Sequence, residues 1–207
     1  MNKRCVILSG GPIFDYSKIK PMILPTDYII AADRGLHHAA CMGITPHLAV
    51  GDFDSHQTPD MKIDTVQLPC EKDDTDTYYA VKEALSRGYR DILILGATGG
   101  RSDHMLANLY TLLYIKQKGA VGTMADEYCL ITPVCGTATV NGDYPYFSLV
   151  TVAGQAKGVT ITGAKYPLQD GIIDPCYQYG VSNQVLPGQT AHIKVESGEV
   201  LLILSRD

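Results

Sequence analysis

The chain has 207 residues, 45% of them hydrophobic, and a formal net charge of -5. This length allows one large domain or two small ones. The acidic balance, without any run of Lys or Arg, argues against a nucleic-acid partner bound through its phosphates. The first apolar run, Cys5 to Leu8, is too short for a signal peptide or a membrane span. The six cysteines form no Cys-x-x-Cys pair, so we expect reduced thiols and a cytoplasmic protein.

The first half of the chain alternates short apolar runs with helical patterns. Strands are predicted over residues 5–8, 28–32, 48–50, 64–68 and 91–95. Helices are predicted where apolar residues recur at helical spacing, and they end at Gly43, Gly88 and Gly119. This alternation is typical of an α/β domain with a mainly parallel sheet.

Two clusters of aspartates frame the segment between the third strand and the next helix. Asp52 and Asp54 directly follow the third strand, and in an extended or turn conformation their side chains point the same way. Alone, this pair is more typical of a solvated turn with capping residues than of a cation site. Asp73, Asp74 and Asp76 precede the helix, where capping and the helix dipole explain one or two of them. Together with the first pair, Asp76 could complete an oxygen-only site suited to Mg²⁺.

A glycine-rich turn leaves the strand over residues 91–95 and opens the next helix. In such a turn, backbone N–H groups like those of Gly99 and Gly100 can bind a phosphate. Arg101 could add a bidentate contact to phosphate oxygens. The spacing matches neither a Walker A nor a dinucleotide motif. Asp103 and His104 could belong to the same site, or they could be a helix cap and a surface residue.

Helical periodicity ends near residue 133. Short β-rich runs follow, separated by Gly, Pro, Asn and Asp, over residues 137–140, 147–152, 158–162, 191–195 and 200–204. This spacing is typical of a small all-β sandwich or barrel. We therefore predict an α/β catalytic domain over residues 1–134 and a smaller β-rich domain over residues 135–207.

Taken together, these segments resemble the thiamine pyrophosphokinase family, in its shorter bacterial form. The resemblance rests on the order and spacing of Ala32-Asp33-Arg34-Gly35, Gly51-Asp52-Phe53-Asp54-Ser55, Lys72-Asp73-Asp74-Thr75-Asp76, Gly96 to His104, Lys165-Tyr166-Pro167-Leu168 and Gly180-Val181-Ser182-Asn183. It implies a nucleotide-binding α/β domain and a thiamine-binding β domain. It also implies a homodimer, with each active site between the N-terminal part of one subunit and the C-terminal part of the other.

The resemblance further implies transfer of pyrophosphate from ATP to the thiamine hydroxyl, with Mg²⁺ as cofactor and no membrane or nucleic-acid partner. The expected catalytic residues are Asp52, Asp54, Asp73 and Asp76; the metal ligands are Asp52, Asp54 and Asp76; the nucleotide-binding residues are Asp33, Gly99, Gly100, Arg101, Asp103 and His104; and the thiamine-binding residues are Ser182 and Asn183. The base is either Asp73 or Asp76, since the sequence does not separate them.

The chain contains no tryptophan, so Tyr177 or Tyr179 is a candidate to stack on thiamine in its place. Two other classes of protein also fit clustered aspartates or a glycine turn. A metal-dependent phosphohydrolase or glycosyltransferase would act without thiamine. A non-catalytic module that senses nucleotide or thiamine would have little use for so many carboxylates.

Overall fold

The computed structural model describes residues 3–52, 63–69 and 73–207. The chain divides into two compact units, Met1–Glu127 (unit 1) and Tyr128–Asp207 (unit 2). Within the described ranges, no helix has the length and apolar character needed to cross a membrane.

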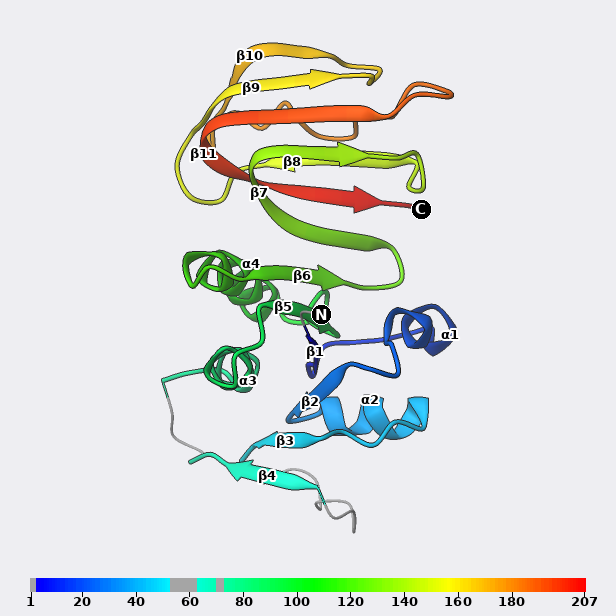
Figure 1. Ribbon diagram of the computed structural model, residues 1–207, viewed down its shortest axis with the longest axis vertical. Coiled ribbons are helices and arrows are strands. Elements are labelled where there is room, and N and C mark those ends of the chain that lie inside the picture. The colour runs from blue at the N-terminus through cyan, green and yellow to red at the C-terminus, as the bar shows by residue number, and fades with distance from the viewer. Residues whose placement is uncertain (1–2, 53–62, 70–72) are drawn as a thin grey trace. The chain divides into compact units, whose positions relative to one another are not determined.

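Unit 1 contains a parallel sheet (Figure 1). Its described strands are β1 (Arg4–Leu8), β2 (Tyr28–Ala32), β3 (Leu48–Gly51), β4 (Asp64–Gln67), β5 (Asp91–Leu95) and β6 (Val121–Ala125). They lie in the order β4-β3-β2-β1-β5-β6, and every pair of neighbours is parallel. Most of these strands are buried along almost their whole length, as expected for a parallel sheet covered on both faces.

Helices cover both faces of this sheet. They are α1 (Tyr16–Ile19), the 3-10 helix η1 (Lys20–Met22), α2 (Gly35–Met42), α3 (Asp76–Ser86) and α4 (Ser102–Gln117). Figure 1 shows α1 and α2 on one side and α3 and α4 on the other. Val6 and Leu8 of β1 pack in one cluster with Ala39 and Met42 of α2. Because side chains alternate along a strand, Ile7 must face the opposite side, toward α3 and α4.

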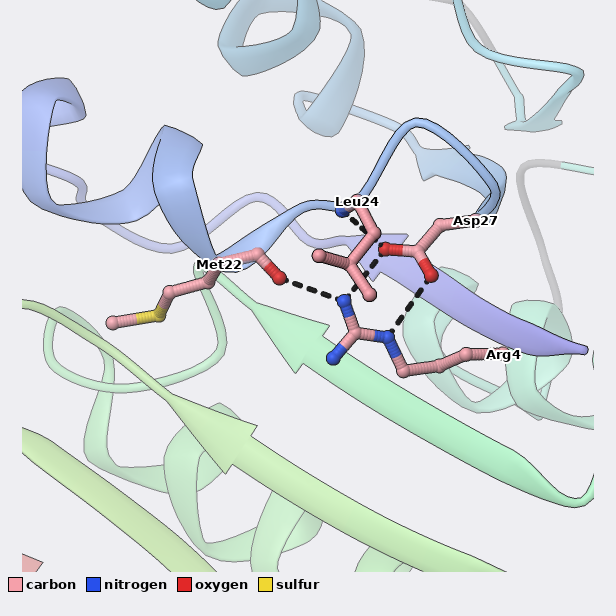
Figure 2. Close-up of polar contacts among 4 residues, drawn as sticks. All are labelled: Arg4, Met22, Leu24 and Asp27. Carbon is pink, nitrogen blue, oxygen red and sulfur yellow. Dashed lines mark hydrogen bonds and ion pairs between the residues drawn. The ribbon is translucent and has the colours of Figure 1, made fainter.

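An ion pair joins the amino ends of β1 and β2 (Figure 2). The Arg4 guanidinium donates to both carboxylate oxygens of Asp27, at 3.0 and 2.6 Å, and to the Met22 carbonyl at 2.7 Å. Asp27 also accepts from the Leu24 N–H at 2.7 Å. The Asp27 side chain is only 1% exposed, so its charge depends on these bonds in place of water. The same contact with Asp27 raises the pKa of Arg4.

Unit 2 is built from antiparallel strands, and residues 128–207 contain no helix. The strands are β7 (Cys129–Val140), β8 (Tyr146–Val150), β9 (Ala156–Thr162), β10 (Leu168–Ile173) and β11 (Ala191–Ser205). β11 is central, because it pairs with β7, β8 and β9, and β10 lies beyond β9. Its first half pairs with β7 and β9, and its second half with β7 and β8, on either side of an irregularity between Val195 and Val200. The inward side chains form one core that includes Phe147, Leu149 and Leu202.

The predicted fold class, an α/β region followed by an all-β region, is confirmed. Sequence reasoning missed β6 and β10, predicted only the second part of β7, and divided β11 into two runs. Pro133, near which the helical pattern ends, pairs with Leu201 inside the β7–β11 ladder. Proline lacks only the N–H, so it interrupts a strand only where the ladder needs that donor. The expected domain boundary, between residues 134 and 135, falls within β7.

Candidate active site

The strand order of unit 1 reverses between β1 and β5. From β1 the chain proceeds outward through β2, β3 and β4, and it returns to the other side of β1 with β5. In open parallel sheets, ligands bind outside the carboxyl ends of the strands at such a reversal. A cavity of about 750 Å³ lies there, lined by the turns after β1 and β5, the end of β2, and the starts of α2, α3 and α4. All of its lining residues belong to unit 1.

Two glycine turns form one wall of this cavity. The Gly11 N–H donates to the Gly96 carbonyl at 2.7 Å, and a Cβ on Gly11 would lie 2.6 Å from that oxygen. The turns can therefore meet only because Gly11 has no side chain. Gly99 and Gly100 have φ of 68° and 64° and lie against Pro12, a backbone conformation that glycine adopts without strain. The predicted phosphate turn is thus a packed part of the cavity wall.

Asp33 lies at the cavity where β2 passes into α2. Its φ is 48°, and its N–H donates to the Val50 carbonyl at 2.8 Å. A left-handed conformation outside glycine costs free energy and is concentrated at functional sites. This hydrogen bond to β3 helps to hold the backbone of Asp33 in that conformation at the carboxyl end of β2.

The start of α3 forms a further part of the wall. Asp74, Thr75, Asp76 and Thr77 line the cavity, and the Thr75 side chain caps the helix by accepting from the Tyr78 N–H at 3.2 Å. Thr75, and neither neighbouring aspartate, therefore supplies the cap. A buried hydrogen bond between the hydroxyls of Thr77 and Ser9 ties this helix to the end of β1.

The remaining predicted carboxylates lie elsewhere. Asp52 follows β3 and is half-buried, and Asp73 is exposed, but neither lines the cavity. Asp54 lies outside the described residues. Among the residues that are described, no group of three or more His, Cys, Asp or Glu side chains is close enough to hold a metal. The donors present, carboxylates at the ends of β2 and β3 and at the start of α3, are nonetheless hard oxygens of the type that Mg²⁺ prefers.

Of the residues predicted to bind the nucleotide, Arg101 and His104 line the cavity, whereas Asp103 does not. Arg101 donates to both oxygens of Asp103, with Nε–Oδ1 at 3.1 Å and Nη2–Oδ2 at 2.6 Å. This contact lowers the pKa of Asp103 to about 2. Arg101 is the N-cap residue of α4, so the alternative reading of Asp103 as the N-cap is wrong.

Sequence reasoning missed two buried residues that brace these turns. The Asn108 side-chain amide donates to the Ala97 carbonyl at 2.9 Å. The His38 ring contacts the Gly11 carbonyl through Nε2 at 2.8 Å and the Tyr16 hydroxyl through Nδ1 at 2.9 Å, and burial lowers its pKa. The geometry assigns a neutral ring that donates from Nε2 and accepts at Nδ1. The sequence signal that could have indicated Asn108 is its position as a polar residue among the apolar positions of α4.

In unit 2, the side chain of Asn183 is used by the fold. Its Nδ2 donates to the Tyr166 carbonyl at 2.7 Å, while its Oδ1 accepts from the N–H groups of Tyr166 at 3.0 Å and Gln184 at 2.9 Å. Its backbone forms both bonds of a bridge with Phe147. Ser182 differs, because it is exposed, has φ of 60°, and uses its backbone N–H, which donates to the Ser148 hydroxyl oxygen at 3.0 Å.

Several tyrosine rings near this pair are exposed. Tyr166 is 58% exposed, and Tyr177 and Tyr179 are 70% and 42% exposed, with ring centroids 5.3 Å apart. The Tyr179 hydroxyl donates to the Ile172 carbonyl at 2.8 Å. Tyr166 therefore joins Tyr177 and Tyr179 as a candidate ring for stacking, since Asn183 holds its backbone.

The parallel sheet, the cavity at its reversal and the glycine turns define unit 1 as a doubly wound α/β unit. Comparison with known proteins identifies the family. The family model described as "Thiamin pyrophosphokinase, catalytic domain" matches residues 19–122, and the one described as "Thiamin pyrophosphokinase, vitamin B1 binding domain" matches residues 137–200. The chain belongs to the thiamin pyrophosphokinase family.

Individual relatives agree with this assignment. The thiamine pyrophosphokinase of Bacillus subtilis (strain 168) is 29% identical over 188 residues, which cover 86% of this chain and 87% of the relative. A crystal structure of thiamine pyrophosphokinase from Bacillus subtilis has a TM-score of 0.90 at 26% identity, covering 99% of this chain and 100% of that one. A thiamin pyrophosphokinase from Geobacillus thermodenitrificans has a TM-score of 0.85 at 28% identity, with coverages of 99% and 98%.

Proposed function

We propose that this chain is a thiamine diphosphokinase, which transfers the terminal pyrophosphate of ATP to the hydroxyl of thiamine and releases AMP. The observation that carries the proposal is the cavity of unit 1, where two glycine turns and the carboxylates of Asp33 and Asp76 meet at the reversal of a parallel sheet. Most residues that line this cavity, from Ala32 to Asn108, lie in the region that matches the catalytic family model, and the others, from Ser9 to Tyr16, precede that region.

The reaction forms one bond and breaks one. The thiamine hydroxyl oxygen bonds to the β-phosphorus of ATP, the bond from that phosphorus to the α,β-bridging oxygen breaks, and AMP leaves with this oxygen. The hydroxyl proton passes to a carboxylate. Asp76 lines the cavity and Asp73 does not, which favours Asp76 as the acceptor because a base must lie within hydrogen-bond reach of the proton.

The proposed nucleotide contacts come from the turns already described. The Gly99 and Gly100 backbone, with Arg101, would hold phosphate oxygens, and Asp33, Asp103 and His104 complete the proposed nucleotide site. Asp52, Asp54 and Asp76 would hold Mg²⁺, which supplies charge neutralisation and orientation of the phosphates when it is bound. The protein's own contribution is positioning and electrostatic stabilisation.

Thiamine binding is proposed for unit 2, at Ser182 and around Asn183. The exposed Ser182 hydroxyl is the better candidate for a direct contact, because the Asn183 amide already bonds to Tyr166. The proposal includes a cytoplasmic homodimer whose active sites each use the N-terminal part of one subunit and the C-terminal part of the other, as the family resemblance implies.

One assay tests the activity directly. The protein is incubated with ATP and Mg²⁺, with and without thiamine, and AMP, phosphate and thiamine diphosphate are measured. We expect AMP and thiamine diphosphate in equal amounts, and only when thiamine is present. Release of phosphate at the same rate without thiamine would instead indicate a phosphohydrolase, and binding of ATP without any product would indicate a sensing module.

A further inference from the structure

The two arginines that line the cavity of unit 1 differ in their partners. Arg101 is held by both oxygens of Asp103. The Arg34 guanidinium, by contrast, forms no hydrogen bond or ion pair with any residue in the described ranges 3–52, 63–69 and 73–207. Arg34 is exposed and lines the same cavity. The cavity therefore has one guanidinium bound to a carboxylate and one with its donors available to a ligand.

The backbone around Arg34 is closely fixed. Arg34 follows the left-handed Asp33 and precedes Gly35, the first residue of α2. A Cβ on Gly35 would lie only 1.9 Å from the Leu8 carbonyl oxygen, and one on Gly10 would lie 3.2 Å from the Arg34 Cβ. The base of the Arg34 side chain thus lies against the turn after β1. Such packing fixes where the side chain leaves the backbone, which lowers the entropy cost of binding.

The carboxylates that line the cavity would repel an anionic ligand unless a cation such as the Arg34 guanidinium offsets them. Asp33, Asp74 and Asp76 bring these carboxylates to the cavity lining, and Asp74 is paired with Lys82. A nucleoside triphosphate is itself highly anionic, so it would be repelled by these carboxylates unless cations face it. A guanidinium presents several N–H donors in a planar fork that matches phosphate oxygens.

We propose that Arg34 binds the phosphate groups of the nucleotide in this cavity, a role that rests on the proposed function. In this arrangement Arg34 supplies a guanidinium from the end of β2. Arg101 approaches from the turn after β5 and must first loosen its contact with Asp103 to do the same. Arg34 is thus a determinant of affinity for the triphosphate, and its effect on thiamine is small.

Calorimetry of ATP binding in the presence of Mg²⁺ and absence of thiamine tests this role. We expect Arg34→Gln to weaken ATP binding about 10- to 100-fold, as for loss of a charged hydrogen-bonding group, and Arg34→Lys to weaken it less. Binding of adenosine, which has no phosphate, should stay unchanged in both variants. In steady-state assays, Arg34→Gln should raise the KM for ATP and leave the KM for thiamine near the wild-type value.

A matched control is Arg90→Gln. Arg90 precedes β5 at the amino end of the sheet and donates to the carbonyls of Leu85 and Tyr89, so this variant removes the same charge away from the cavity. It should bind ATP as the wild type does. Equal ATP affinity in Arg34→Gln and wild type would overturn the role of Arg34 and leave the proposed function standing. Failure of the wild type to bind ATP would overturn both.

Discussion

In unit 1 the polar side chains that line the cavity belong to turns that follow buried strands. In unit 2, by contrast, the side chain of Asn183 forms hydrogen bonds that hold two segments of the fold together. Asp33 and Arg34 follow β2, and Arg101 follows β5, so the strands would persist without these side chains. Asn183, in contrast, bonds to both backbone groups of Tyr166. Substitutions in the cavity should therefore separate stability from activity in unit 1, whereas substitution of Asn183 should affect both together in unit 2.

Unit 1 offers this separation in space as well. The Arg4–Asp27 ion pair lies at the amino ends of β1 and β2, and the cavity lies at the carboxyl ends. One end of the sheet thus carries a stabilising ion pair, and the other end is the proposed site of ligand binding. The following experiments, from the largest expected effect to the smallest, test this division.

Asp27→Ala should lower the free energy of unfolding by about 3–5 kcal/mol, because it leaves the partly buried Arg4 without its carboxylate. Urea denaturation measures this change. Glu83→Ala is the matched control, since the Arg87–Glu83 pair is more exposed, at 38% and 23%, and should contribute less than about 1 kcal/mol. If Asp27→Ala lowers the free energy of unfolding by less than about 1 kcal/mol, the ion pair at the amino ends of the strands is not a main source of stability.

Asp52→Asn should reduce kcat for AMP formation by at least about 100-fold, as expected when a metal-binding group is lost. Its free energy of unfolding should change by less than about 1 kcal/mol, since Asn is nearly isosteric. Activity and urea denaturation are measured on the same preparation. Near-wild-type turnover would contradict the assignment of Asp52 to the metal, and a large loss of stability would contradict the separation proposed for unit 1.

Asn183→Ala should lower the stability of unit 2 by about 1–3 kcal/mol, because it leaves the backbone groups of Tyr166 without their partner. Hydrogen exchange at the Tyr166 amide should become faster. Ser182→Ala is the matched variant, and it should raise the KM for thiamine with little change in exchange. Equal behaviour of the two variants would show that Asn183 acts as a simple ligand contact.

Thiol labelling at pH 8 tests how readily the central strands of unit 1 open to solvent. Burial raises the pKa of Cys5 in β1 to about 12, so this thiol stays protonated and unreactive at pH 8, far below that pKa. The exposed Cys41, Cys135 and Cys176 should react more than about 100-fold faster. Labelling of each peptide is followed by mass spectrometry. A similar rate at Cys5 would mean that the sheet opens readily.

Much of unit 1 could be predicted because its signals are local. The apolar runs of β2 and β5 coincide with the observed strands, and Gly43 ends α2 in the left-handed conformation that glycine favours. The placement of Asp33, Asp76 and the glycine turn at one cavity follows from the rule that parallel strands present their carboxyl ends at one edge.

The bracing contacts could not be predicted, because they join residues far apart in the chain. His38 lies 27 residues from Gly11, and Asn183 lies 17 residues from Tyr166. No periodicity encodes such pairs. The contrast between Arg34 and Arg101 was hidden for a similar reason, since a sequence shows two arginines but not which one a carboxylate already holds.

Because β11 is central, the sheet of unit 2 cannot be completed until β11 is available for pairing. β11 follows β7, β8, β9 and β10 in the chain, yet three of these strands pair directly with it. During synthesis, β7 and β8 would emerge from the ribosome with hydrogen-bonding edges that no earlier segment of unit 2 can satisfy. Exposed edges of this kind promote aggregation. Truncation of residues 200–205 should therefore lower the soluble yield of the protein far more than its small length suggests.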